Sequence, residues 1–171
     1  DELAAMHAAI ERRAAGEPLQ YVTGEMPFRH IVLRCEEGVL IPRPETEVLV
    51  DAALEGVDAA VGRRSAGEKD PDAADAPVRV LEVGTGTGCI ALSIASERPG
   101  THVTATDLSP RAVALATRNR EALGLEERVE LVECDLASGV SPELMGTFSV
   151  LVSNPPYIPT AVLASEVPAD V

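Results

Sequence analysis

The sequence has few of the residues that build a nucleic-acid-binding surface. It contains no tryptophan, two tyrosines and two phenylalanines, so it cannot form a platform on which several bases stack. Acidic residues outnumber basic ones by 28 to 14, which gives a formal net charge of −14, and Lys69 is the single lysine. Proteins that bind nucleic acid neutralise phosphates with lysine and arginine. The composition therefore disfavours a nucleic-acid substrate.

Cysteine and long apolar runs are scarce as well. Cys35, Cys89 and Cys134 are far apart and form no C-x-x-C pair, so neither a disulfide framework nor a metal site is predicted. We expect all three to be buried as small hydrophobic residues. No apolar run approaches the ~18 residues of a membrane span, and Asp1-Glu2 opens no signal peptide. These absences predict a cytoplasmic protein with no membrane partner.

The chain is long enough for one domain with a sizeable core. With 171 residues, 46% of them hydrophobic, it can bury roughly 70% of its unfolded surface. Residues 1–15 carry Leu3, Met6 and Ile10 at helical spacing and stop at Gly16, which predicts a helix. Because this apolar stripe needs a partner, we expect further helices to precede it.

A hairpin is expected next. Residues 28–41 alternate loosely around Cys35-Glu36-Glu37-Gly38, which predicts two strands joined by a glycine-containing turn. We therefore take residues 1–26 as the end of an N-terminal helical domain and residues 27–44 as a connecting β-hairpin.

From residue 45 onward the pattern alternates between helices and strands. A helix over residues 45–61 and a polar segment over 62–77 come first. The later elements are expected as a strand over 78–83, a helix over 89–97, a strand over 102–106, a helix over 110–123, and strands over 129–134 and 149–153. This order predicts an α/β fold with a doubly wound, Rossmann-like parallel sheet that binds ligands beyond the carboxyl ends of its strands. Four strands are few for such a sheet, so we expect its C-terminal strands to follow this sequence.

A glycine-rich turn separates the first of these strands from its helix. In Glu82-Val83-Gly84-Thr85-Gly86-Thr87-Gly88 the glycines permit a tight turn and let a ligand approach N–H groups at the helix N-terminus. Gly86-Thr87-Gly88-Cys89-Ile90-Ala91 also satisfies the loose dinucleotide pattern, so the glycines alone leave a nicotinamide cofactor and S-adenosylmethionine open. Glu82 would repel a pyrophosphate but can lie near a sulfonium and an ammonium. That carboxylate favours the methyl donor.

The next two strand ends also carry candidate contacts. Asp107 follows its strand directly, where a carboxylate can accept hydrogen bonds from both ribose hydroxyls. A helix N-cap is the alternative, although Ser109 is the better cap. After the following strand, Asp135 meets the adenine edge or lies in a surface turn, two alternatives that stay open, and Leu136 is placed to pack on the ring.

Asn154-Pro155-Pro156-Tyr157 follows the last strand. The prolines restrict the backbone and donate no N–H, so the loop presents two acceptors, the Asn154 side-chain oxygen and the Pro155 carbonyl. Two convergent acceptors can hold an NH₂ group whose lone pair must turn toward a methyl group. Tyr157 can pack on the planar group and exclude water.

Together these motifs resemble a class I S-adenosylmethionine-dependent methyltransferase that acts on a planar nitrogen. Two N-terminal stretches resemble the HemK/PrmC family in particular, the N5-glutamine methyltransferases of peptide chain release factors. They are Gly16-Glu17-Pro18-Leu19-Gln20-Tyr21-Val22-Thr23-Gly24 and Val39-Leu40-Ile41-Pro42-Arg43-Pro44-Glu45-Thr46-Glu47. The resemblance covers roughly residues 16–160 and implies that the second stretch lies beside the active site. Taken alone, Arg43, Glu45 and Glu47 fit a solvated helix start equally well.

The resemblance implies a methyl transfer from S-adenosyl-L-methionine to the glutamine of the Gly-Gly-Gln motif in a release factor, leaving S-adenosyl-L-homocysteine and using no metal. Residues 1–26 would be the end of a helical substrate-binding domain, and residues 45–171 would form the donor-binding methyltransferase domain of a monomer. The donor would contact Gly84, Thr85, Gly86, Thr87, Gly88, Asp107, Leu136 and Asn154, and the substrate amide would be held by Asn154, Pro155, Pro156 and Tyr157.

Other readings remain open at this point. A glutamine in a ribosomal protein and an exocyclic amine of a nucleic-acid base are alternative substrates, since enzymes for both share the Asn-Pro-Pro-Tyr motif. The net charge of −14 opposes the second. A nicotinamide-dependent oxidoreductase leaves residues 154–157 unexplained, and a binding module without catalysis is a further alternative.

Overall fold

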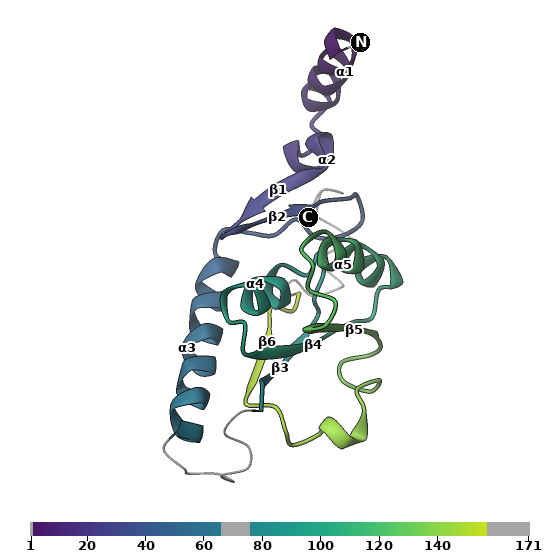
Figure 1. Cartoon of the computed structure of the whole chain (residues 1–171). Helices are drawn as coiled ribbons and strands as arrows, with labels where there is room; N and C mark the ends of the chain where they lie inside the picture. The colour runs from purple at the N-terminus through teal and green to yellow at the C-terminus, as the bar shows by residue number, and fades with distance from the viewer. Residues whose placement is uncertain (1, 66–75, 157–171) are drawn as a thin grey trace.

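The computed structural model describes residues 2–65 and 76–156. The elements in chain order are α1 (Glu2–Ala14), α2 (Leu19–Thr23), β1 (Glu25–Phe28), β2 (Ile31–Arg34), α3 (Thr46–Ser65), β3 (Val78–Val83), α4 (Cys89–Glu97), β4 (Thr101–Asp107), α5 (Pro110–Ala122), β5 (Val129–Glu133), the 3-10 helix η2 (Pro142–Leu144) and β6 (Val150–Ser153). Figure 1 shows α1 and α2 projecting from a body in which helices pack on a sheet.

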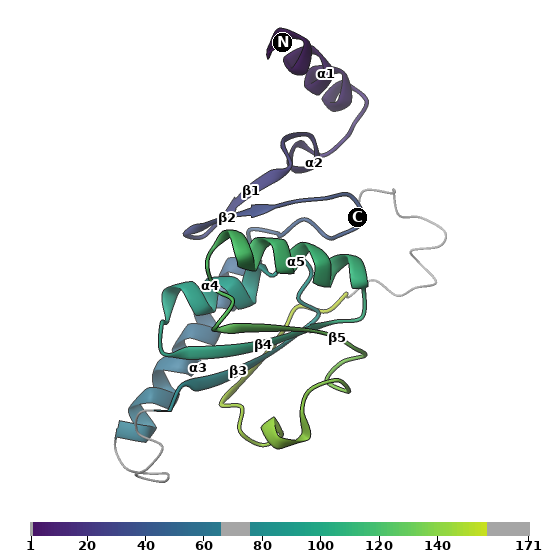
Figure 2. The same ribbon diagram turned by 45° about the vertical axis from the view of Figure 1, so that its right-hand side comes forward.

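The central sheet is parallel, with the order β5-β4-β3-β6. Along the chain, β4 and then β5 are added on one side of β3, and β6 is added on its other side. Because crossovers between parallel strands are right-handed, reversing the direction moves the crossover to the opposite face of the sheet. The helices α3, α4 and α5 lie on one face, and the connection through η2 lies on the other (Figure 2). The predicted α/β, Rossmann-like sheet is confirmed.

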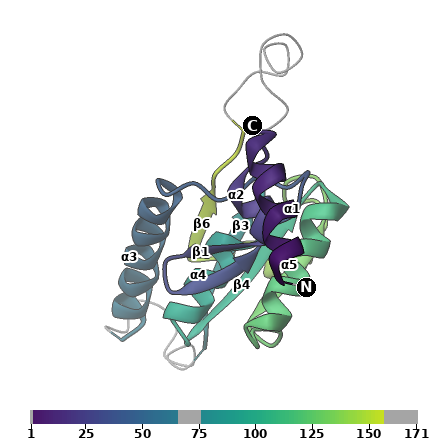
Figure 3. The ribbon, with the colours of Figure 1, turned by 90° about the horizontal axis from the view of Figure 1, so that it is seen from above.

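Helix α4 lies between α3 and α5, as the view from above shows (Figure 3). Residues 89–95 of this helix are all buried, since the sheet, both helices and the hairpin surround them. A helix that is apolar on every side is stable only in such a place. The core around it contains aliphatic side chains from strands and helices, chiefly Leu33, Val50, Val57, Val80, Ile90, Leu92, Ile94 and Val103. The beginning of α4, where the glycine-rich turn enters, is therefore rigidly placed.

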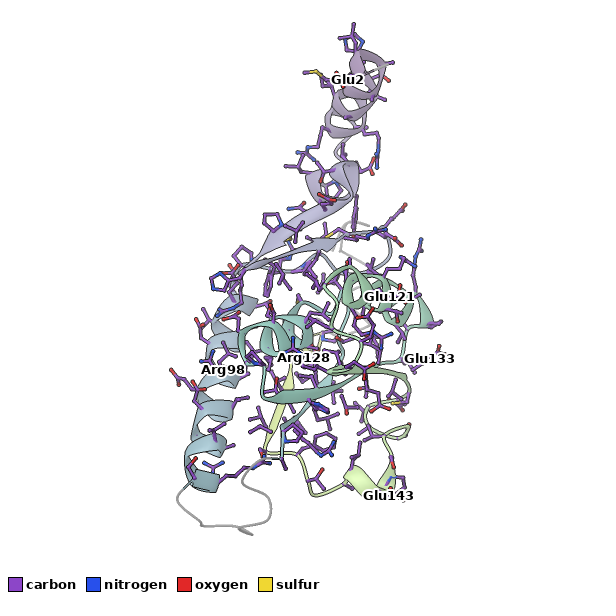
Figure 4. The ribbon with its side chains drawn as sticks, viewed as in Figure 1. Glu2, Arg98, Glu121, Arg128, Glu133 and Glu143 are labelled. Atoms are coloured by element: carbon purple, nitrogen blue, oxygen red, sulfur yellow. The ribbon has the colours of Figure 1, made fainter. Side chains whose placement is uncertain are left out.

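Helices α3 and α4 are also joined by an exposed ion pair. The guanidinium of Arg98, which is labelled in Figure 4, donates to both carboxylate oxygens of Asp58 on α3 at 2.7 and 2.8 Å. Arg98 is 37% exposed and Asp58 55% exposed in their side chains. Pairs as exposed as this contribute little to stability.

The hairpin differs from its prediction. Its strands are β1 and β2, in antiparallel register with Phe28 opposite Ile31, so the turn is Arg29-His30. The prediction that residues 35–38 join the strands is wrong, although a turn with Gly38 at a φ of +83° does form there, after β2. Arg29 adopts a φ of +49°, which disfavours residues with a side chain, and contacts with distant elements hold it there. Its N–H donates to Glu47 and its guanidinium to Glu97. A turn held by such distant partners has no local sequence signal.

Two helices at the N-terminal side follow their predictions with altered detail. Helix α1 ends before Gly16, whose φ is +95°, and none of its residues is buried. Helix α3 continues to Ser65, so the first residues of the segment predicted to be polar linker are helical. Among residues 2–65 and 76–156, no helix combines the length and apolar character needed to cross a membrane. The division of the chain at residues 26 and 44 stays a prediction.

Candidate functional site

Three strand ends meet at one point of the sheet. Val83, the last residue of β3, is paired with Thr106 of β4 on one side and with Ser153 of β6 on the other. The Ser153 hydroxyl also donates to the Val83 carbonyl at 2.8 Å. Gly84, Asp107 and Asn154 are therefore neighbours, although 70 residues separate the first from the last. This is where the winding reverses, the usual ligand site of such sheets.

In the glycine-rich turn, glycines that face open space alternate with threonines that are buried. Gly84, Gly86 and Gly88 have φ values of +79°, +57° and +86°, in the left-handed region where glycine is preferred. Thr85 and Thr87 between them are each only 2% exposed. A Cβ atom added to Gly84 or Gly86 would meet nothing within 4 Å. The glycines thus leave open space in front of the turn, while the threonines point into the protein.

Glu82 anchors this turn from below. Its side chain is completely buried, and one carboxylate oxygen, Oε2, accepts the Thr85 hydroxyl at 2.7 Å and the Ala91 N–H at 3.1 Å. The other oxygen, Oε1, has no hydrogen-bond partner among the described residues. The pKa of Glu82 is raised to about 8, chiefly by burial and to a smaller extent by the charge of Asp107, while the bonds from Thr85 and Ala91 oppose the shift. A cationic partner near Glu82 would therefore stabilise the ionised form of this carboxylate.

Asp107 holds the turn from the side. Its Oδ2 accepts the Gly86 N–H and its Oδ1 accepts the Ser109 N–H, both at 2.9 Å. Ser109 is the N-cap of α5, as the sequence predicts, because its hydroxyl accepts from Ala112. Each oxygen of Asp107 retains a lone pair for a further donor. Asp107 thus accepts the N–H of Gly86, and Glu82 accepts the N–H of Ala91. From the sequence, these N–H groups were expected to be available to a ligand.

That arrangement separates the two cofactor classes that the glycines alone left open. A pyrophosphate at this turn would face the Asp107 carboxylate, and would keep the buried Glu82 protonated, in place of meeting free N–H groups. A ligand with an ammonium and a sulfonium would be attracted by the same carboxylates. The electrostatics of the site therefore fit S-adenosylmethionine and oppose a dinucleotide.

Asn154 comes directly after β6 and is half-buried. Its Nδ2 donates to the hydroxyl of Thr46 at 3.2 Å. Thr46 opens α3 and is 5% exposed. Pro155 and Pro156 follow and are exposed. Tyr157, which the sequence places in the same loop, lies outside the described residues.

A small concavity joins these parts. It has a volume of about 50 Å³ and is lined by Leu40, Pro42, Arg43, Thr46, Glu82, Gly84, Thr85, Gly86, Thr87, Cys89, Ile90 and Asn154. Sites for whole small molecules measure roughly 300–1,000 Å³, so this concavity holds one end of a ligand of that size. Among the described residues that line it, Arg43 is the one lysine or arginine. Arg43 thus brings a positive charge to the concavity that Glu82 also lines.

The structure separates the three charged residues whose role the sequence left open. Arg43 lines the concavity. Glu45 is exposed and does not line it. Glu47 accepts the N–H of Arg29 at 3.1 Å and so holds the hairpin turn. The three neighbours therefore have three different surroundings.

Leu136 follows β5 and is 68% exposed, and Asp135 before it is exposed as well. Leu136 has a φ of +50°, and its carbonyl accepts the Thr106 hydroxyl at 2.7 Å. Neither residue lines the concavity. Leu108, which the sequence reasoning did not select, follows Asp107 and is 71% exposed. Two exposed leucines thus follow the neighbouring strands β4 and β5, and both come after Asp107 in the sequence.

Asn119 was also missed by the sequence reasoning. It lies on α5 and is 1% exposed. Its Oδ1 accepts the Arg34 N–H of the hairpin at 2.8 Å, and its Nδ2 donates to the Thr87 carbonyl at 2.8 Å. One side chain therefore ties the hairpin to the glycine-rich turn. A single asparagine in an amphipathic helix carries no signal for this, since both partners are backbone groups far away in sequence.

The cysteines have no part in the site chemistry. Cys35 and Cys89 are buried as predicted, and burial raises their pKa values to about 11 and about 12, so both are neutral thiols at pH 7. Cys134 is half-buried, which is less than predicted. Within the described part of the chain, no group of three or more His, Cys, Asp and Glu residues is placed to hold a metal ion.

The fold and this site define an α/β methyltransferase domain. The family model for the methyltransferase small domain matches residues 72–167, more than half of the chain, and the chain belongs to that family. The model for the PrmC N-terminal domain matches residues 1–24. The resemblance to the HemK/PrmC family is therefore confirmed.

Two curated relatives show which methyltransferases the chain is similar to. The chain is 45% identical over 165 residues to a release factor glutamine methyltransferase of Chlorobaculum tepidum, covering 96% of this chain and 53% of the relative. It is 46% identical over 160 residues to the protein of that name from Deinococcus radiodurans, covering 94% of this chain and 50% of the relative. The chain spans about half the length of the curated relatives it matches.

Solved structures support the fold. The N-terminal domain of human METTL16, in complex with SAH, matches with a TM-score of 0.54 and 21% identity, over 75% of this chain and 47% of that one. A SAM-dependent methyltransferase from Agrobacterium tumefaciens matches with a TM-score of 0.56 and 22% identity, over 77% of this chain and 39% of that one.

Proposed function

We propose that this protein transfers a methyl group from S-adenosyl-L-methionine to the side-chain amide nitrogen of a glutamine in a peptide chain release factor. The observation that carries the proposal is the position of Asn154. Its side chain lines the same small concavity as the glycine-rich turn and the buried Glu82, at the point where the winding of the sheet reverses. An amide acceptor thus lies beside a site whose charges fit the methyl donor.

The donor would bind with its amino-acid end in the concavity. Its ammonium faces Glu82, whose Oε1 has no partner among the described residues, and its carboxylate faces Arg43. Gly84 to Gly88 leave room for the chain that links these groups to the sulfur. Asp107 accepts hydrogen bonds from the ribose, and Leu108 and Leu136 offer exposed apolar surface to the adenine.

The substrate amide would lie against Asn154 and Pro155. An amide nitrogen is a weak nucleophile because its lone pair is delocalised. Oδ1 of Asn154 and the Pro155 carbonyl can each accept one N–H, and so turn the lone pair toward the methyl carbon. The carbon–sulfur bond breaks as the carbon–nitrogen bond forms, and the nitrogen then loses a proton to water. Correct positioning contributes up to ~7–11 kcal/mol to such a step. Tyr157 is proposed to cover the amide.

The choice of a release factor as substrate is supported by the names of the curated relatives. We propose that the protein acts on it as a cytoplasmic monomer, without binding nucleic acid. The net charge of −14 supports a protein substrate over a nucleic-acid base. A glutamine in a ribosomal protein would present the same chemical group, so the substrate must be tested directly.

Calorimetric titration tests the donor first. S-adenosylhomocysteine should bind at micromolar concentration and NADH should not; tight binding of NADH would contradict the electrostatic argument. Radiolabelled donor then tests transfer to a release factor, with the same factor carrying Asn in place of its Gly-Gly-Gln glutamine as the control. Asn154→Ala should lower turnover by at least ~10²-fold, the effect of losing a directly bound polar group in an active site. Full turnover in Asn154→Ala would rule out the assignment.

A further inference from the structure

Thr46 is the first residue of α3, and it contacts the residue proposed to hold the substrate. Its hydroxyl oxygen accepts the Nδ2 hydrogen of Asn154 at 3.2 Å. Both residues line the concavity. The contact joins the first turn of α3 to the end of β6, across 108 residues of sequence.

In this contact the donor end of the Asn154 amide faces Thr46, which leaves the acceptor end for the site. An asparagine amide has an acceptor oxygen and a donor NH₂ on opposite sides of one rotatable bond. With Nδ2 bonded to Thr46, Oδ1 remains for another partner. If the amide were rotated by half a turn, an NH₂ group would face the NH₂ of the glutamine substrate, and neither could accept. The proposed reaction needs the first orientation.

Thr46 is held firmly in the position from which it contacts Asn154. It is 5% exposed, and its N–H donates to the Arg43 carbonyl at 3.0 Å. The next turns of α3 pack into the core through Val50 and Leu54, which are 0% and 5% exposed. A hydroxyl on a buried, anchored turn moves little, so its partner is fixed as well.

From these contacts we infer that Thr46 is a positioning residue, which orients the Asn154 amide so that its oxygen faces the substrate. This role rests on the proposed function, because the orientation matters only for a substrate that offers N–H groups. It also gives the Pro-Arg-Pro-Glu-Thr-Glu segment a specific task at the active site.

Thr46→Val and Thr46→Ser form a matched pair for kinetics. Valine keeps the shape and removes the hydroxyl, while serine keeps the hydroxyl. With saturating donor, Thr46→Val should lower kcat for release factor by ~10–100-fold, the cost of a misplaced reacting group, while Thr46→Ser stays within about threefold of the wild type. The affinity for S-adenosylhomocysteine, measured by calorimetry, should change by less than about threefold in both. Equal kcat in Thr46→Val and the wild type would overturn the role.

A second readout does not depend on activity. The side-chain NH₂ resonances of Asn154 in a ¹⁵N-labelled protein can be assigned by their loss in Asn154→Asp. They should shift in Thr46→Val and stay in place in Thr46→Ser; unmoved signals in Thr46→Val would overturn the contact. If the wild type transfers no methyl group, the proposed function fails while these resonances still test the contact. Thr46→Ala replaces Thr46→Val if thermal melting shows that valine unfolds the protein.

Discussion

The two walls of the concavity are built in different ways. One wall, residues 84–88, follows β3 directly, and its glycines and buried threonines take their conformation from local sequence. The other wall, residues 40–46, has no regular structure before α3 and is joined through Thr46 to the residue that follows β6. Catalytic sites combine both kinds, because a bound donor needs a preformed cradle while a protein substrate needs a surface from elsewhere in the chain.

The comparison predicts that the protein loses stability when an ion pair at the hairpin turn, far in sequence from the second wall, is removed. Arg29→Ala deletes the guanidinium that donates to Glu97 at 2.7 and 2.9 Å, and both side chains are less than 15% exposed. Breaking this partly buried pair costs ~1–3 kcal/mol, because Glu97 is left without its charged donor. Urea denaturation should show this loss.

Arg98→Ala is the matched control, since Arg98 makes the same bidentate contact with Asp58 at the surface. That substitution should cost less than ~1 kcal/mol. Equal losses for the two variants would mean that the hairpin turn is not held by its ion pair.

The first wall should instead respond to the space around single glycines. Both Gly88 and Gly84 have positive φ, so alanine is strained at either position. At Gly88 the added Cβ would also lie 2.8 Å from Leu92 Cδ1 and 3.3 Å from Ala116 Cβ, whereas at Gly84 it meets nothing. Gly88→Ala should therefore lose ~1–3 kcal/mol more stability than Gly84→Ala. Denaturation curves of the two variants give this difference.

Donor affinity should rank the same two variants the other way. A methyl group on Gly84 projects into the open space in front of the turn, where the donor is proposed to lie. Gly84→Ala should therefore bind S-adenosylhomocysteine more weakly than Gly88→Ala does, although it is the more stable of the two variants. Calorimetry that finds wild-type affinity in Gly84→Ala would place the donor elsewhere.

A smaller effect, on pH dependence, tests Glu82 beneath the first wall. Its pKa is raised to about 8 in the folded protein, above the unfolded value of 4.5, so the folded state binds the extra proton between these limits. The contribution of Glu82 to the free energy of unfolding is then greatest at low pH and falls as pH rises from about 4.5 to about 8. Glu82→Gln cannot titrate, so wild-type stability should decline relative to Glu82→Gln across this range in urea denaturation.

Ligand binding should show the opposite trend for the same residue. An ammonium at Glu82 favours the ionised carboxylate, so the affinity for S-adenosylhomocysteine should rise between pH 6.5 and 8, by at most ~10-fold per pH unit. Glu82→Gln should bind weakly and without that rise. A wild-type affinity that falls over this interval would contradict an ammonium at Glu82.

Much of the sheet could be predicted from the sequence. The strand over 78–83 and the helix over 89–97 were placed at their observed bounds, because apolar β-branched runs and a glycine-rich turn mark them locally. The hairpin turn was misplaced, since Arg29 is held by residues on α3 and α4. The roles of Thr46 and Asn119 were not visible, because their partners are remote in sequence.

The sequence by itself determined the α/β order, the methyltransferase family and the residues that follow each strand. These properties follow from periodicity and from glycine, proline and acidic residues at short spacing. Only the tertiary structure decided that Glu82 and Asp107 take up N–H groups of the turn, that Arg43 lines the concavity, and that Thr46 meets Asn154. Such contacts join groups brought together by strand register and helix packing, which local sequence patterns do not encode.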